Sequence, residues 1–277
     1  MTPSTQQDVL IKAGASVSHY WRDIWRYREL LGFLAWRDLL VRYKQTVAGS
    51  SWALIRPALN TLVFTFLFGR MGKFPSPEGV PYSIVVLSAM VPWQLFSGAV
   101  LGATQSLVTN TNLISKVYFP RLIIPCSSMA VALADLFFAF ILLLGAMLWY
   151  GVAPSVRMLA VPPLALFALM ASLGPSLLIA ALMVKFRDFK HIVPFFIQLG
   201  AYVCPVGFLS SMVPEKWRLL YSCNPMVGVI DGFRWAIHGG EPLHLPGFLI
   251  SMAVTFLFLF LGFWYFRRIE RQFADII

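Results

Sequence analysis

Six long apolar stretches constrain the fold of this chain more than any other feature. Each has about 20 residues or more, the length that an α-helix needs to cross a hydrocarbon core of about 30 Å. They comprise residues 52–70, 83–108, 126–149, 158–184, 192–211 and 246–266. Only 12% of the 277 residues are charged, against about 25% in soluble domains. We therefore predict an all-α integral membrane protein with six transmembrane helices in residues 52–266.

The basic residues predict the orientation of these helices. If the N-terminus is cytoplasmic, sixteen of the 22 Lys and Arg residues fall in cytoplasmic segments. Such an excess on the inner side is the usual bias of membrane proteins. Both termini are therefore expected in the cytoplasm, with residues 1–30 as an N-terminal segment and 267–277 as a tail. The net charge of +10 then reflects topology and attraction to lipid headgroups, and not binding to nucleic acid.

An amphipathic helix is predicted before the first span, within residues 31–51. Apolar residues recur at spacings of three and four and share one stripe, opposite a polar face. The stripe holds Phe33, Trp36, Leu40, Tyr43 and Val47, and the polar face holds Arg37, Asp38, Lys44 and Gln45. This pattern is typical of a helix lying in the membrane interface, although a cytoplasmic helix packed on a partner shows the same pattern. Gly49 and Ser50 are expected to end the helix.

Residues 212–245 form the longest segment between predicted spans and are too polar to cross the membrane. Asn224 can cap a helix that begins at Pro225, and Gly239 with Gly240 can end it. We expect periplasmic helices that re-enter the outer leaflet or lie on it.

A short segment with two prolines joins the second and third predicted spans. Asn112 can cap a helix "LISKVYF", which Pro120 would end. Its Lys116, Tyr118, Phe119 and Arg121 would face the cytoplasm. A rigid helix there is suited to receiving motion from a soluble partner. An interfacial turn with snorkelling basic side chains is the alternative interpretation.

Motifs for catalysis are missing from the sequence. The Gly72-Lys73 pair lacks the spacing of a phosphate-binding loop. Asp135 is the one acidic residue inside a predicted span, which makes it a functional candidate, although a hydrogen bond to a neighbouring helix is the favoured explanation because no second charge is present to form a relay. The three cysteines have no metal-ligand spacing and are expected to be unpaired, with a Cys204–Cys223 pair left open.

Three stretches resemble the permease subunit of bacterial ABC exporters for O-antigen and teichoic-acid polymers. They are "LAWRDLLVRYKQTVAGSSWALIRPAL" at 34–59, "NLISKVYFPRLIIP" at 112–125 and "NPMVGVIDGFRWAIHG" at 224–239. The resemblance covers residues 30–270 and implies a multi-pass protein of the bacterial cytoplasmic (inner) membrane. It implies a homodimer joined by two copies of a separate ATPase subunit, which uses ATP and Mg, while this chain holds no cofactor or metal.

The implied substrate is a lipid-linked (polyprenyl-diphosphate) polysaccharide such as O-antigen. Capsule, teichoic-acid and small-molecule export are alternatives within the same class. A membrane-embedded glycosyl- or acyltransferase would need catalytic carboxylates or histidines at the membrane surface, where acidic residues are sparse. A secondary carrier would need several ion-coupling residues at the bilayer midplane.

The resemblance also assigns a coupling helix, and the residues themselves suggest two further sites. Residues 113–121 would be the coupling helix on the ATPase, with Ser115, Lys116, Tyr118, Phe119 and Arg121 in contact. Arg37, Arg42, Lys44 and Arg56 lie where a lipid-linked diphosphate would arrive, or they attract bulk anionic lipid. Aromatic residues near the outer boundary would line the path or its periplasmic exit, or form an interfacial belt. These are Trp93, Phe96, Tyr202, Trp217, Tyr221 and Trp235.

Overall fold

The computed structural model describes residues 17–44, 51–239, 242–270 and 273, and the regular structure within these ranges is helical throughout. The predictions for residues 1–16, Gln45, Val47, Gly49, Ser50, Gly240 and most of the tail lie outside the described residues. The helices are α1 (Val17–Arg26), α2 (Arg28–Lys44), α3 (Ser51–Phe64), the π-helical η1 (Thr65–Met71), α4 (Tyr82–Thr109), α5 (Thr111–Lys116), α6 (Ile123–Trp149), η2 (Val156–Ala160), α7 (Val161–Lys185), α8 (Phe189–Val203), η3 (Ser210–Met212), α9 (Glu215–Tyr221), α10 (Pro225–Ile237) and α11 (Leu245–Ile269).

Five helical segments in the described residues are long and apolar enough to cross a membrane. They are Ser51–Met71, Tyr82–Thr109, Ile123–Trp149, Val156–Lys185 and Leu245–Ile269, and each matches a predicted span within a few residues. The predicted helix 192–211 is wrong in its second half, because α8 ends at Val203 after 15 residues. Cys204 is extended (φ −72°, ψ 153°) because it precedes Pro205, and a residue before proline avoids the helical conformation.

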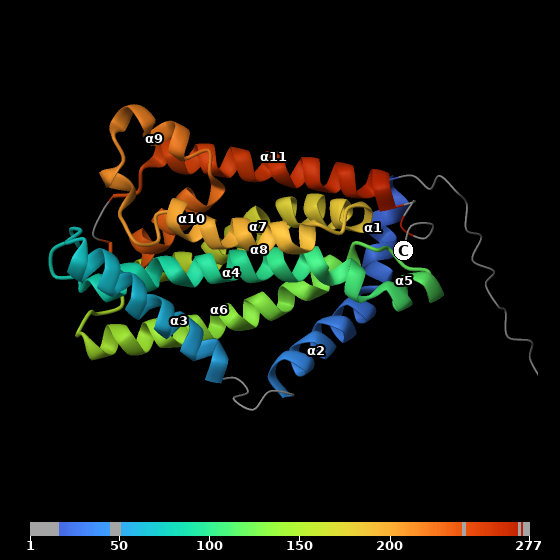
Figure 1. Cartoon of the computed structure of the whole chain (residues 1–277), viewed down its shortest axis with the longest axis horizontal. Coiled ribbons are helices and arrows are strands. Elements are labelled where there is room, and N and C mark those ends of the chain that lie inside the picture. Colours follow the sequence, from blue (N-terminus) through green and yellow to red (C-terminus); the bar gives the residue numbers. More distant parts are fainter. Residues whose placement is uncertain (1–16, 45–50, 240–241, 271–272, 274–277) are drawn as a thin grey trace, which may run out of the picture.

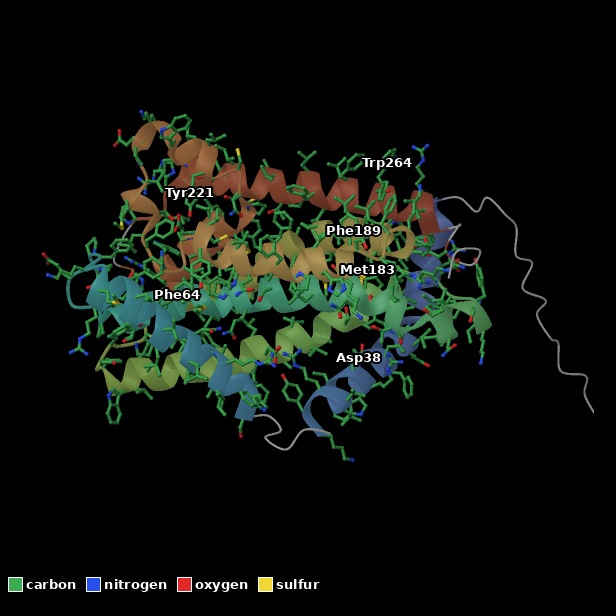
Figure 2. All side chains as sticks on the ribbon, viewed as in Figure 1. Asp38, Phe64, Met183, Phe189, Tyr221 and Trp264 are labelled. Carbon is green, nitrogen blue, oxygen red and sulfur yellow. The ribbon has the colours of Figure 1, made fainter. Side chains whose placement is uncertain are left out.

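The long helices lie side by side along the long axis of the molecule, with α4 in the centre (Figure 1). Helices α6, α7 and α10 pack against α4, which buries most of its residues. Outer helix faces instead expose large apolar residues such as Phe137, Phe260 and Trp264. Figure 2 shows Trp264 on the outward side of α11. Exposed apolar faces of this kind suit contact with lipid tails, which are as apolar as leucine.

Helices α7 and α11 approach each other closely at two glycines. A Cβ atom on Gly174 would lie 2.5 Å from the carbonyl carbon of Phe258, and one on Gly262 would lie 2.4 Å from the carbonyl oxygen of Gly174. These neighbours are backbone atoms, which cannot rotate away as a flexible side chain would. Only glycine fits at both positions, as is common where membrane helices cross at short distance.

The predicted helix cap at Asn224 is confirmed. The Asn224 side chain accepts a hydrogen bond from the Met226 N–H at 3.0 Å, and Pro225 takes the first helical position. Gly239 follows with a φ of +62°. Ten of the 13 residues of α10 are buried, because α10 inserts between α4, α7 and α11. The predicted alternative that this helix lies on the membrane surface is therefore wrong for α10. Helix α9, in contrast, has no buried residue.

Helix α2 differs from the predicted interfacial helix in bounds and orientation. It begins at Arg28 and slants along α6 away from the end of the bundle (Figure 1). Phe33, Trp36 and Leu40 are exposed as the stripe predicts. Tyr43 does not belong to that stripe, because its hydroxyl bonds to α6. Arg37 bonds to Asn110 at the end of α4, and Arg42 and Tyr43 bond to Asp135 of α6, so the exposed apolar face is free to contact lipid.

Candidate functional site

A cavity of about 850 Å³ opens between α2, α3, α4 and α6. It extends from Asn110, at the end of α4, to Gln94, near the middle of that helix. Its walls combine arginines, carboxylates, amides and hydroxyls within the bundle. The polar lining residues are Arg37, Asp38, Arg42, Tyr43, Arg56, Asn60, Gln94, Ser97, Gln105, Ser106, Thr109, Asn110, Ser128 and Asp135.

One wall of the cavity is a polar face of α4 that the sequence analysis missed. Gln94, Ser97, Gln105 and Thr109 follow helical spacing and line the cavity together. The Nε2 atom of Gln94 is buried and has no hydrogen-bond partner among the described residues, so it is available to a molecule in the cavity. The signal was readable, because polar residues on one helical face inside a span mark a buried or water-lined surface.

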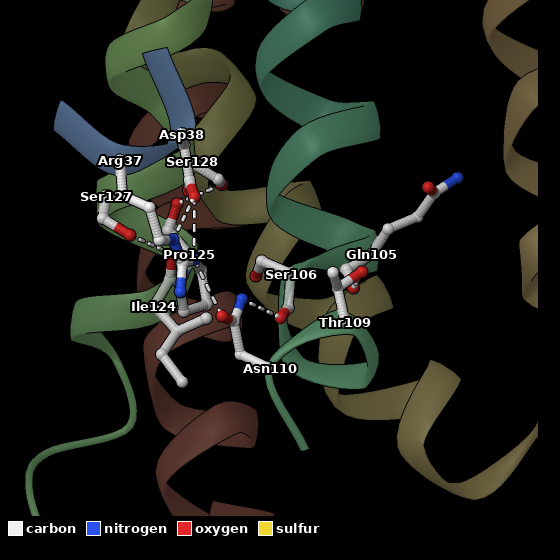
Figure 3. Close-up of polar contacts among 10 residues, drawn as sticks. All are labelled: Arg37, Asp38, Gln105, Ser106, Thr109, Asn110, Ile124, Pro125, Ser127 and Ser128. Atoms are coloured by element: carbon white, nitrogen blue, oxygen red, sulfur yellow. Dashed lines mark hydrogen bonds and ion pairs between the residues drawn. The ribbon is translucent and has the colours of Figure 1, made fainter. Parts of the chain in front are cut away.

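Arg37 joins α2 to the end of α4. Its Nη2 atom donates to Asp38 Oδ1 at 2.7 Å and to Asn110 Oδ1 at 2.8 Å. Asn110 Nδ2 in turn donates to the Ser106 carbonyl at 2.8 Å. Figure 3 shows this network beside Gln105 and Thr109. The guanidinium is thus held at the edge of the cavity.

The intramembrane carboxylate of Asp135 is bonded by two residues of α2. Arg42 Nη2 forms an ion pair with Asp135 Oδ2, and the Tyr43 hydroxyl donates to Oδ1 at 2.6 Å. Burial raises the pKa of Tyr43, and the bond to Asp135 raises it further, so the phenol stays a proton donor. Asp135 is 8% exposed and lies near the middle of α6. The end of α2 therefore reaches deep along α6, which explains how this carboxylate is tolerated.

Three of the four basic residues predicted to meet a lipid-linked diphosphate gather in this cavity. Arg37, Arg42 and Arg56 all line it. Lys44 is exposed at the end of α2 and lies outside the lining. The three arginines come from two different helices, so the fold, and not the sequence order, brings them together.

The predicted coupling helix is shorter than expected. Helix α5 ends at Lys116 and its N-cap is Asn110, not Asn112. Val117 is extended (φ −129°, ψ 134°), which ends the helix before Pro120. Ser115, Lys116 and Tyr118 are exposed. The prediction that Phe119 lies exposed beside them is wrong, because Phe119 is 4% exposed and packs in a core cluster with Leu34, Ile114 and Phe266.

Arg121 links this segment to the end of α11. Its backbone N–H donates to Glu270 Oε1 at 2.8 Å, and its guanidinium donates to the Glu270 carbonyl. Burial raises the pKa of the Glu270 carboxyl above its usual value, and the hydrogen bond from the Arg121 backbone N–H offsets only part of this rise. Glu270 was not predicted as a site residue, since nothing in the sequence connects it with a segment 149 residues away.

Three of the six predicted aromatic residues, Trp93, Phe96 and Trp235, share one hydrophobic core cluster, and the other three lie outside it. Trp93 and Phe96 lie 5.5 Å apart between ring centroids, while Tyr202 stacks on Phe64. The Tyr221 hydroxyl donates to the Val203 carbonyl at 2.8 Å. Trp217 is exposed. The Cζ atom of Arg157 lies 5.8 Å from the ring centroid of Trp235. A common role in a sugar path therefore stays a prediction.

The cysteines are free at positions 126, 204 and 223, as expected. The sulfur of Cys204 accepts a hydrogen bond from Asn224 Nδ2 at 3.2 Å, which holds the end of α8 near the start of α10.

Known proteins are similar to this chain in sequence. Residues 29–238 match the model of the ABC-2 type transporter family. The chain is 27% identical over 250 residues to the O-antigen export system permease protein RfbA of Klebsiella pneumoniae, covering 90% of this chain and 95% of that protein. It is 28% identical over 258 residues to a Myxococcus xanthus protein of the same name, covering 92% and 98%. The capsule polysaccharide export inner-membrane protein CtrC of Neisseria meningitidis is 23% identical over 220 residues, covering 76% and 80%.

The family match includes all of the cavity-lining residues as well as the segment between α4 and α6. It spans well over half of the chain, and the apolar helices agree with it. This protein therefore belongs to the ABC-2 type transporter family of membrane proteins.

Proposed function

We propose that this chain is the membrane-spanning subunit of an ATP-driven exporter that moves a lipid-linked polysaccharide, such as O-antigen, across the bacterial cytoplasmic membrane. The relatives named for O-antigen export support this substrate class. Capsule polysaccharide is the second candidate, because a relative named for capsule export also aligns over most of the chain.

The cavity carries this proposal. A polyprenyl-diphosphate-linked sugar has a highly charged diphosphate next to hydroxyl groups. Arginines recognise phosphate oxygens through charge-assisted, often bidentate hydrogen bonds. Amide and hydroxyl side chains can pair with sugar hydroxyls. Arg37, Arg42 and Arg56 provide the first set, and the polar face of α4 provides the second beside them.

In this proposal a separate cytoplasmic subunit hydrolyses ATP, and this chain is not itself an enzyme. Two such subunits dock on the exposed Ser115, Lys116 and Tyr118 of a homodimer. Helix α5 sits between the ends of α4 and α6, so a displacement of α5 moves both spans. Family membership and the missing phosphate-binding loop support this division of labour.

Both described ends of the chain lie at the same end of the bundle, which supports six crossings with cytoplasmic termini. The Arg267 guanidinium, near the end of α11, lies 4.5 Å from the ring centroid of Tyr20 in α1. Five long helices alone would leave the two ends on opposite sides. Helix α8, which runs back along the bundle after α7 (Figure 1), supplies the additional crossing in this proposal.

Glutamine substitutions of the cavity arginines test the site. We expect purified protein in zwitterionic phosphatidylcholine nanodiscs to bind farnesyl diphosphate saturably, as measured by titration calorimetry. Arg37→Gln, Arg42→Gln and Arg56→Gln should each weaken binding about tenfold, the loss of one charge-assisted contact. Lys44→Gln, which removes the same charge outside the cavity, should leave binding unchanged.

Two controls separate a built site from general attraction. Farnesol should not bind, and added phosphatidylglycerol should compete only weakly. If Lys44→Gln weakened binding as much as Arg42→Gln, the cavity would not be a diphosphate site. For the whole function, proteoliposomes should move a lipid-linked glycan only with the ATPase subunit and ATP. Transport by this chain alone would contradict the proposal.

A further inference from the structure

The Arg42–Asp135 pair is asymmetric. The Asp135 side chain is 11% exposed, whereas that of Arg42 is 42% exposed, and both line the cavity. The carboxylate is fixed within α6, while the guanidinium is open to a molecule in the cavity. An arginine has five N–H donors, and the Arg42 side chain uses Nη2 toward Asp135. The same cation that would bind a diphosphate is therefore already bound to an internal anion.

This pair also connects two helices. Arg42 and Tyr43 attach the C-terminal end of α2 to α6 through the carboxylate of Asp135, and the Tyr43 ring also packs on Phe138 of α6. The other acidic residue of the cavity, Asp38, pairs with its neighbour Arg37 within α2 and does not bridge to another helix through that pair. Asp135 is thus the carboxylate whose loss would weaken the contact between α2 and α6.

We propose that Asp135 competes with anionic headgroups for Arg42 and so sets a threshold of affinity for binding. Asp135 holds Arg42 through Nη2, and a diphosphate that takes this donor displaces the carboxylate and removes one of the bonds that join the end of α2 to α6. This inference rests on the proposed function, because it requires the headgroup to reach the cavity. It adds a residue that opposes binding, as specific sites often use repulsive elements against unwanted ligands.

The competition sets a threshold of affinity that weakly bound headgroups do not reach. Displacing Asp135 lowers the apparent affinity of every anion by the same factor, namely the fraction of molecules with Arg42 available. A singly charged phospholipid binds weakly and loses nearly all of its occupancy. A diphosphate carries more charge, which acts strongly in a low-dielectric cavity, and it still binds. Asp135 thereby keeps bulk lipid out of the site.

The test compares Asp135→Asn with Glu29→Gln, which removes one negative charge from an exposed position on α2 outside the cavity. Farnesyl diphosphate binding is measured by calorimetry in phosphatidylcholine nanodiscs. We expect Asp135→Asn to bind about tenfold more tightly and to become sensitive to added phosphatidylglycerol. Glu29→Gln should match the wild type. Adding Arg42→Gln to Asp135→Asn should abolish the gain, because the gain requires the freed guanidinium.

Equal or weaker binding by folded Asp135→Asn, or an equal gain in Glu29→Gln, overturns the inference while the wild-type site stands. If the wild type itself showed no saturable binding, the proposed function would fail and this inference with it.

A second measurement needs no change at Asp135. Spin labels at Leu40 and Phe137, both exposed, are introduced with Cys223→Ser and diluted with unlabelled chain. Saturating farnesyl diphosphate should lengthen or broaden their distance distribution, and an unchanged distribution overturns the release of α2.

Discussion

Replacing Gly174 with valine is expected to prevent the protein from accumulating in a folded form. The new side chain would meet the backbone of Phe258 and Leu259, where a Cβ atom alone would lie 2.5–2.7 Å from the nearest atoms. Relief requires α7 and α11 to separate along their contact, which should cost about 3 kcal/mol or more. Gly262→Val should behave in the same way, because its Cβ would meet Gly174.

The control for this prediction is Gly145→Val in α6. A Cβ atom there would have no neighbour within 4 Å, so the variant should elute as the wild type does in size-exclusion chromatography and unfold at the same temperature. Aggregation or loss of Gly174→Val with normal Gly145→Val is the expected result. A monodisperse Gly174→Val with unchanged thermal unfolding would show that α7 and α11 do not cross as described.

Changing the exposed side chains of residues 115–118, the proposed coupling segment, is expected to reduce export strongly without unfolding the protein. Lys116→Glu combined with Tyr118→Ala alters two exposed side chains on which the proposed ATPase contact depends. The variant should insert normally, lose co-purification with the ATPase and reduce ATP-driven export at least about tenfold, since a contact residue at an interface centre is worth about 1–2 kcal/mol or more. Pull-down and proteoliposome transport measure these effects.

Two neighbouring changes give contrasting results. Phe119→Ala should destabilise the protein by about 3 kcal/mol, because it empties a buried aromatic position. Lys216→Glu, on exposed α9 at the far end of the bundle, should leave ATPase binding intact. Normal ATPase binding by the Lys116→Glu, Tyr118→Ala variant would refute the coupling role of this segment.

The sequence predicts most of the spans because long apolar stretches, prolines and caps act locally. Five spans and the Asn224 cap follow from such signals. The early end of α8 also had a local cause, since Cys204 precedes Pro205. The polar face of α4 was equally readable from the spacing of Gln94, Ser97 and Gln105. Both features therefore follow from local sequence signals.

Other features depend on contacts between distant parts of the chain. The pairing of Arg42 with Asp135 spans 93 residues, and amphipathic periodicity does not tell which helix the polar face will meet. The same limit applies to Phe119, whose burial depends on residues from α2 and α11. The site could be predicted as a set of residue types, but its assembly into one cavity required the fold.

The bonds between Arg121 and Glu270 have a consequence for how motion spreads through the bundle. Peptide bonds make α4 and α6 follow any shift of the segment between them, and the bonds to Glu270 make the last helix follow as well. That helix is closely packed on α7 at Gly174 and Gly262. A push on this segment would therefore be passed to four helices together, of which α7 and α11 are not adjacent to it in the sequence.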